Sequence, residues 1–141
     1  MSRFAVACVL AGILGALTMA AATARVLAKV SIAQQTMSVY IDGDLAYTWK
    51  VSTGRKGFAT PRGSFRAQWL DPDHLSSIYE SAPMPHSVFF LGGYAVHGSN
   101  EVRRLGHPAS HGCVRLSPGD ATTFYSLVED SGLSATHIVI N

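Results

Sequence analysis

Residues 36–52, TMSVYIDGDLAYTWKVS, decide how this chain folds. They form two runs rich in Val, Ile, Tyr, Thr and Trp, which are the residue types that favour β-strands. The runs are joined by Asp42, Gly43 and Asp44, and an Asp-Gly pair supplies the positive φ angles that tight hairpin turns require. The stretch therefore predicts a β-hairpin with strands at 36–41 and 45–52.

Further strands are predicted on both sides of this hairpin. Short runs of β-branched and aromatic residues, bounded by Gly, Pro and polar residues, indicate strands. We expect them at 30–33, 64–70, 87–91, 94–97 and 136–140. The segments 54–63 and 71–85 are expected to be loops, and the region leading to residue 112 to be irregular.

One helix is clearly signalled after these strands. Ser117 is a typical N-cap, Pro118 suits the first helical position, and Asp120 follows the cap by three residues. Apolar residues then recur at helical spacing until Gly132, a residue that commonly ends helices. The sequence therefore predicts a single small domain that is mainly β, with one principal helix.

The composition restricts the class of protein. The chain has 141 residues, 11 Lys plus Arg, 9 Asp plus Glu and a formal net charge of +2. No basic cluster is longer than a pair, whereas a nucleic-acid surface needs several cations on one face. A nucleic-acid partner is therefore not expected, and 48% hydrophobic residues argue against disorder.

The first 24 residues have the layout of a secretory signal peptide. A basic start at 1–3 precedes an apolar stretch at 4–17 and small residues at 20–24. We expect cleavage after Ala24, a domain at 29–141, and export to the periplasm or cell envelope with no stable membrane span. The alternative is an uncleaved helical anchor, because about 20 apolar residues can span a bilayer.

Cys113 is the single cysteine that remains once residues 1–24 are removed. No disulfide can then form within the chain, and an unpaired thiol in an oxidising compartment calls for a reason. Three of the six histidines, at 97, 107 and 111, fall within the 17 residues that end at Cys113. A structural cysteine would be expected among apolar strand residues instead, so the pattern favours a nucleophile.

The residues around Cys113 supply the groups that thiol catalysis needs. The thiolate is the nucleophile, and at its ordinary pKa only a few per cent of a thiol is ionised at neutral pH. Either His97 or His111 could take the proton, and Arg115 could add positive charge or anchor a carboxylate. Gly112 and nearby loop amides could donate hydrogen bonds to an oxyanion.

A metal site is the competing interpretation of the same residues. It would use His107, His111 and Cys113, with His97 as a fourth ligand. The spacing His-x3-His-x-Cys matches none of the common paired zinc-ligand arrangements, so we expect neither a metal nor another cofactor. The remaining histidines are expected to be surface or structural residues: His74, His86 and His137.

Four motifs together resemble one known family. They are Val51-Ser52-Thr53-Gly54, Ala59-Thr60-Pro61-x-Gly63-x-Phe65, Val96-His97-Gly98-Ser99 and Gly106-x-Pro108-Ala109-Ser110-His111-Gly112-Cys113-Val114-Arg115-Leu116. In this order they resemble the YkuD-type L,D-transpeptidase catalytic domain, and the likeness covers about residues 29–141. The resemblance implies a β-sandwich-like fold, which agrees with the strands expected above.

The resemblance also implies an activity and a set of site residues. The nucleophile would be Cys113, and His97 would accept and return the proton. The remaining site-lining or substrate-binding residues would be Ser110, His111, Gly112 and Arg115. The implied reaction is acyl transfer on bacterial peptidoglycan, in which a stem tetrapeptide loses its terminal D-alanine and an amine accepts the acyl group during wall cross-linking or remodelling.

Two other functions are compatible with the same fold. One is a family member that hydrolyses wall linkages, and the other is a noncatalytic peptidoglycan-binding domain. The presence of both Cys113 and His97 argues against the noncatalytic alternative. We expect peptidoglycan stem peptides as the partner and a monomer as the oligomeric state.

Overall fold

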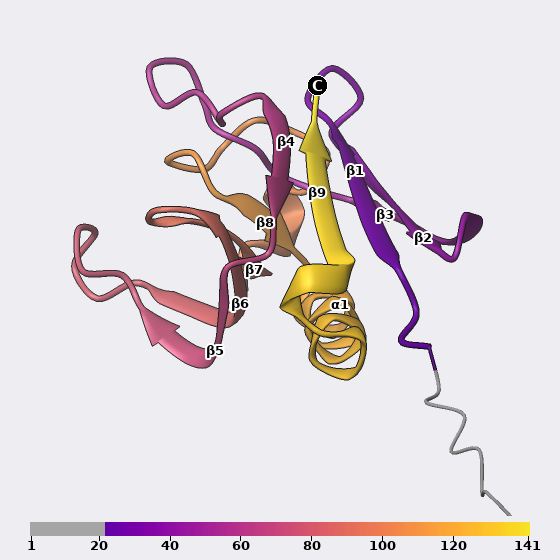
Figure 1. Cartoon of the computed structure of the whole chain (residues 1–141). Helices are drawn as coiled ribbons and strands as arrows, with labels where there is room; N and C mark the ends of the chain where they lie inside the picture. Colours follow the sequence, from indigo (N-terminus) through magenta and orange to yellow (C-terminus); the bar gives the residue numbers. More distant parts are fainter. Residues whose placement is uncertain (1–21) are drawn as a thin grey trace, which may run out of the picture.

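The computed structural model describes residues 22–141 and contains two β-sheets and one α-helix (Figure 1). The first sheet, in the order β3-β2-β1-β9-β4, contains β1 (Val26–Ser31), β2 (Thr36–Ile41), β3 (Asp44–Lys50), β4 (Gly63–Arg66) and β9 (Thr136–Ile140). The second, in the order β5-β6-β7-β8, contains β5 (Trp69–Leu75), β6 (Pro83–Leu91), β7 (Tyr94–Gly98) and β8 (Val114–Leu116). Helix α1 (Pro118–Ser131) contacts strands of both sheets, and two short 3₁₀ turns are η1 (Val102–Arg104) and η2 (Leu133–Ala135).

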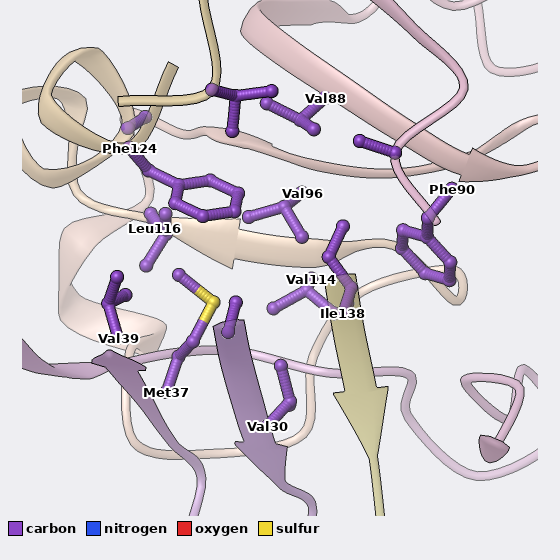
Figure 2. Packing of buried hydrophobic residues seen from close by; sticks show 14 of the residues in the cluster. Val30, Met37, Val39, Val88, Phe90, Val96, Val114, Leu116, Phe124 and Ile138 are labelled. Carbon is purple, nitrogen blue, oxygen red and sulfur yellow. The ribbon is translucent and has the colours of Figure 1, made fainter. Parts of the chain in front are cut away.

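The hydrophobic core lies between the two sheets and against α1. Figure 2 shows side chains from the first sheet meeting those of the second sheet and of the helix. The labelled residues are Val30, Met37, Val39 and Ile138 from the first sheet, Val88, Phe90, Val96, Val114 and Leu116 from the second, and Phe124 from α1. The predicted fold class, a mainly β sandwich-like domain with one principal helix, is confirmed.

The hairpin predicted at 36–52 is formed by β2 and β3. Ile41 pairs with Asp44, so the turn consists of two residues, Asp42 with φ +51° and Gly43 with φ +90°. Positive φ at both positions is the geometry that an Asp-Gly turn favours. The strand before the hairpin was expected at 30–33 but is β1, because Val26, Ala28 and Val30 alternate into the core.

The single strand expected at 64–70 is instead two strands, β4 and β5. The chain changes sheets between them, at Ala67 and Gln68. The Ala67 amide donates to the carbonyl of Thr136, next to β4 in the first sheet, and the Gln68 amide donates to the carbonyl of Phe89 in the second. A continuous apolar and polar alternation in the sequence hides this change of partner.

The loop expected at 71–85 is largely a β-hairpin, because β5 continues to Leu75 and β6 begins at Pro83. Pro72 is tolerated because it lies on β5, the outer strand of its sheet. Pro83 is tolerated because it is the first residue of β6, before the residues 88–91 that pair with β7. Strand β8 was also not expected. Its three residues pair in parallel with β7, and Arg115 also pairs with Ser52.

Helix α1 begins where its capping residues predict. The Ser117 hydroxyl accepts a hydrogen bond of 3.2 Å from the Asp120 amide, and Pro118 occupies the first turn. The helix ends at Gly132, which has φ +91°. Because α1 starts five residues after Cys113, its packing against β6 and β7 fixes the end of the segment that carries the thiol.

The predicted signal peptide at 1–24 lies almost entirely outside the described residues. Within residues 22–141, no helix combines the length and apolar character that crossing a bilayer requires.

Candidate active site

Strands β7 and β8 place the candidate catalytic residues on one face of the second sheet. Val96 pairs with Val114 in parallel register, and both side chains are buried in the core between the sheets. Successive side chains of a strand point to opposite faces. His97, Cys113 and its neighbour Arg115 therefore lie on the outer face, away from that core.

A cavity of about 490 Å³ opens on this outer face. Its floor includes His97, Cys113 and Arg115, and its walls include Glu101 and His111. The remaining lining residues come from the loop between β5 and β6 and from the start of β6: Ser76, Ile78, Tyr79, Glu80, Ala82, Pro83 and Met84. Four of the six site residues expected from sequence thus meet in one cavity.

A larger cavity of about 910 Å³ lies beside β1, on the first sheet. Arg25, Lys29, Tyr40 and His137 contribute to its lining, together with residues of the extended segment before β1. It contains no thiol, so its size does not make it the site of cysteine chemistry.

The Cys113 thiol lies against the turn between β6 and β7. The Ala95 amide donates to Sγ at 3.4 Å, and the thiol donates to the Gly93 carbonyl at 3.7 Å. Burial raises the pKa of the Cys113 thiol, although the Ala95 amide and the charge of Arg115 act in the opposite direction. The thiol is therefore protonated at neutral pH, whereas sequence reasoning expected nearby positive charge to keep it ionised.

His97 is a neutral base in this environment. Its Nδ1 atom lies 2.7 Å from the carbonyl oxygen of Gly98, and a carbonyl only accepts hydrogen bonds, so Nδ1 carries the hydrogen. The lone pair is then on Nε2. The side chain is only 5% exposed, and burial lowers the pKa of His97 to about 4. At neutral pH both His97 and Cys113 are uncharged.

Ser110 stabilises the turn at residues 110–113, which carries the Cys113 thiol. Its buried hydroxyl donates to the carbonyl oxygen of Cys113 at 2.6 Å and accepts from the Gly112 amide at 3.0 Å. The Ser110 amide in turn donates to the Thr53 carbonyl. Because the Gly112 amide is engaged in this way, it is not the free oxyanion donor that the sequence suggested.

Gly112 is required by the backbone and by a close neighbour. Its φ is +120°, and a Cβ atom at this position would lie 2.7 Å from Cε1 of Tyr94. Its carbonyl accepts a hydrogen bond of 2.8 Å from the Thr60 hydroxyl, which itself accepts from the Gly54 amide at 2.9 Å. The motifs around Gly54 and Thr60 therefore support the cysteine turn and do not line the cavity.

Arg115 faces a carboxylate within the cavity itself. Its guanidinium lies 3.2 Å from Oε2 of Glu101, and the same oxygen lies 3.4 Å from Nε of Arg104. The Arg115 side chain is 17% exposed and that of Glu101 is 53% exposed. Sequence reasoning proposed Arg115 as a carboxylate anchor but missed Glu101, because nothing in the irregular segment before residue 112 singles it out.

His111 forms a wall of the cavity. Its ring stacks on Tyr79 with centroids 4.1 Å apart and meets Phe58 edge-on at 4.8 Å. Burial and the charges of Arg55 and Arg115 lower the pKa of His111. Tyr79 was missed because its segment was expected to be a plain loop.

The alternative metal site does not assemble in the part of the chain that the structure describes. No group of three or more His, Cys, Asp or Glu side chains in residues 22–141 is placed to hold a metal ion. The His111 ring instead stacks on Tyr79 and meets Phe58 edge-on. The segment at His107 is held by the His107 backbone carbonyl, which accepts from the Ser52 hydroxyl at 2.7 Å.

Comparison with known proteins gives one consistent family. The family model of the YkuD L,D-transpeptidase catalytic domain matches residues 25–140. The curated YkuD protein of Bacillus subtilis (strain 168) is 23% identical over 116 residues, which cover 79% of this chain and 63% of that protein. The solved L,D-transpeptidase from Mycobacterium smegmatis is 30% identical with a TM-score of 0.74, covering 84% of this chain and 59% of that one.

A second solved structure contains an adduct derived from a drug. L,D-transpeptidase 3 from Mycobacterium tuberculosis, in complex with a faropenem-derived adduct, is 23% identical with a TM-score of 0.73. The match covers 84% of this chain and 60% of that one, and at this identity it shows a shared fold alone. The present chain spans about three fifths of the length of these relatives. Because the family model covers residues 25–140, the chain belongs to the YkuD family of L,D-transpeptidase catalytic domains.

Proposed function

We propose that this protein is a peptidoglycan L,D-transpeptidase with Cys113 as its nucleophile and His97 as its general base and acid. One observation carries the proposal: the thiol and a neutral imidazole with Nε2 unprotonated line the same cavity. Membership of the family supports an enzyme that acts on peptidoglycan.

In the first step, Nε2 of His97 accepts the thiol proton while Sγ attacks the carbonyl carbon of the third residue of a stem tetrapeptide, at its L-centre. A tetrahedral intermediate with a negative oxygen forms. The bond from this carbon to the terminal D-alanine nitrogen then breaks, and protonated His97 returns the proton to the leaving amine. The products of the step are free D-alanine and a thioester on Cys113.

In the second step, an amine attacks the thioester carbon. His97 takes the proton of the incoming amine, the C–S bond breaks, and the proton returns to sulfur, which restores the thiol. A side-chain amine of a neighbouring stem peptide would give a direct cross-link. Other amines would give exchange or attachment products, and water would give hydrolysis.

The uncharged resting pair suits this sequence of proton transfers. A buried thiolate and imidazolium would both need stabilisation before substrate arrives, and burial disfavours each of them. In this site the charges form only when attack begins. The Ala95 amide at 3.4 Å from Sγ and the guanidinium of Arg115 then lie where they can stabilise negative charge.

The location of peptidoglycan places the activity outside the cytoplasm. We therefore retain the interpretation of residues 1–24 as an export signal that is cleaved after Ala24.

The proposal is tested by incubating the exported protein with muropeptides that carry a tetrapeptide stem. The expected result is release of D-alanine together with a cross-linked product, both lost in Cys113→Ala and His97→Ala. The product masses distinguish cross-linking from hydrolysis. Unchanged D-alanine release by Cys113→Ala would remove Cys113 from the mechanism, and no release by the unaltered protein would favour a noncatalytic domain.

A further inference from the structure

Trp69, on β5, keeps part of its apolar surface in contact with solvent. The side chain is 41% exposed, although its ring stacks on Phe89 with centroids 3.7 Å apart and an angle of 1° between the planes. Phe89 itself is only 1% exposed. One face of the indole therefore covers a buried ring, and its other side accounts for the exposed area.

The orientation of this indole is fixed by a third ring. His74 meets Trp69 edge-on at 5.6 Å and Phe89 edge-on at 4.9 Å. His74 is held in turn by Asp71, whose Oδ2 lies 2.9 Å from Nδ1. Trp69 is the first residue of β5, the outer strand of the second sheet (Figure 1), so the exposed part of its indole lies at the edge of that sheet.

Trp69 lies in the same row of the second sheet as the nucleophile. It pairs with Phe89 on β6, Phe89 pairs with Ala95 on β7, and the Ala95 amide contacts Sγ of Cys113 just before β8. Neighbouring strands are separated by about 4.8 Å, so the two spacings from β5 to β7 give a lateral distance of about 10 Å between Trp69 and Ala95, beside which Sγ of Cys113 lies. The exposed indole and the thiol are thus on one face of the sheet, about two strand spacings apart.

This separation is close to the length of a donor stem peptide. Three extended residues span about 10–11 Å at 3.3–3.6 Å each, and the group that joins the peptide to its sugar adds to that length. A sugar attached to a stem whose third residue is at Cys113 therefore reaches the region of Trp69. Flat aromatic faces stack on the apolar C–H faces of pyranose rings, and the partly exposed Asp71 carboxylate can accept from sugar hydroxyls.

We propose that Trp69 is a stacking platform for a sugar ring of the glycan strand that carries the donor stem peptide. The inference rests on the proposed function and adds a glycan subsite outside the catalytic cavity.

The first test compares two donors, a free stem tetrapeptide and the same tetrapeptide on its disaccharide. For Trp69→Ala we expect KM to rise about three- to tenfold for the disaccharide-linked donor and to stay within about twofold for the free peptide. Trp69→Phe, which keeps a flat ring, should recover most of the loss. Tyr47→Ala is the matched control, because Tyr47 is a 38% exposed aromatic residue on the other sheet and should change neither KM.

A second measurement does not depend on altering Trp69. The chain has two tryptophans, Trp49 and Trp69, so its NMR spectrum has two indole N–H signals. Adding disaccharide-tetrapeptide to Cys113→Ala protein should shift the Trp69 signal and leave that of Trp49 in place, whereas the free tetrapeptide should shift neither.

The outcomes separate this inference from the proposed function. Equal changes in KM for both donors in Trp69→Ala, or no change in either, would overturn the platform, as would an unmoved Trp69 signal. If the unaltered protein releases D-alanine from neither donor, the transpeptidase proposal fails and the glycan subsite fails with it. If the unaltered protein releases D-alanine normally but Trp69→Ala shows no selective rise in KM for the disaccharide-linked donor, the platform alone is overturned and the transpeptidase proposal stands.

Discussion

The Ser110 hydroxyl donates a hydrogen bond of 2.6 Å to the carbonyl oxygen of Cys113, and thereby links the residue three positions earlier to the nucleophile. The Ser110 hydroxyl oxygen also accepts a hydrogen bond of 3.0 Å from the Gly112 amide. Ser110→Ala removes both bonds and leaves a buried amide without its partner, which costs about 1–3 kcal/mol. We expect a lower melting temperature and a larger loss in kcat than in KM.

The control for this experiment is Ser126→Ala, since Ser126 is exposed on α1. Thermal melts and steady-state kinetics on both variants provide the comparison. A Ser110→Ala protein with the kcat and melting temperature of the Ser126→Ala protein would mean that the turn holds Cys113 without Ser110.

The burial of His97 makes the folded state sensitive to mild acid. Its pKa is lowered to about 4 in the folded protein from an ordinary value of 6.5. Between these values the unfolded chain binds a proton that the folded chain does not, so the free energy of unfolding falls as the pH drops from 6.5 to 4. The difference of about 2.5 pKa units corresponds to roughly 3 kcal/mol.

Urea unfolding at several pH values measures this effect. In His97→Gln the decline between pH 6.5 and pH 4 should shrink, because glutamine does not titrate. If both proteins lose stability in parallel over this range, the decline arises from other groups. For the unaltered enzyme, the acid limb of kcat/KM should likewise lie well below pH 6.5.

We expect Glu101 to compete with a substrate carboxylate for Arg115, because the Glu101 carboxylate lies 3.2 Å from the Arg115 guanidinium within the cavity. Glu101 is half exposed, so this ion pair is weak and is exchanged at little cost. We expect Glu101→Gln to lower KM for a carboxylate-bearing donor about two- to fivefold while kcat changes little.

Steady-state kinetics at low and high salt check this expectation, with Glu129→Gln on the exposed side of α1 as the control. A rise in KM for Glu101→Gln would show that Glu101 helps to bind the substrate and does not compete with it.

Gly112→Ala should abolish D-alanine release and lower the melting temperature. The added Cβ would lie 2.7 Å from the Tyr94 ring, in a backbone region with φ +120° that other residues rarely adopt. Gly119→Ala is the matched control, because nothing lies within 4 Å of its Cβ position at the start of α1. Retained activity in Gly112→Ala would show that the cysteine turn tolerates a different backbone.

Much of the architecture was predictable because local signals and tertiary structure agree. The Asp42-Gly43 turn, the strand at 136–140 and the capped helix each depend on residues close in sequence. The hairpin of β5 and β6 was not predictable in this way, since Pro72 and Pro83 are typical of loops. Pro72 is tolerated because β5 has no strand on its outer side, and Pro83 is tolerated because it begins β6 before the residues that pair with β7.

Some residues of the site could be predicted from local sequence motifs, whereas others reach the site only through the fold of the whole domain. Cys113, His97 and Arg115 stand in recognisable motifs, and the structure brings them into one cavity. Glu101 and Tyr79 reach that cavity through loop geometry, for which their sequence neighbours give no signal. The charge state of the pair was also not predictable, because burial, which depends on the whole fold, determines both pKa values.

The central claim is that Cys113 is a nucleophile that a substrate can reach and acylate. The most direct test is the intact mass of the protein after exposure to a carbapenem, followed by peptide mapping. We expect one added drug-derived mass, located on Cys113 and absent from Cys113→Ala. An unmodified protein, or an adduct that persists in Cys113→Ala, would contradict it.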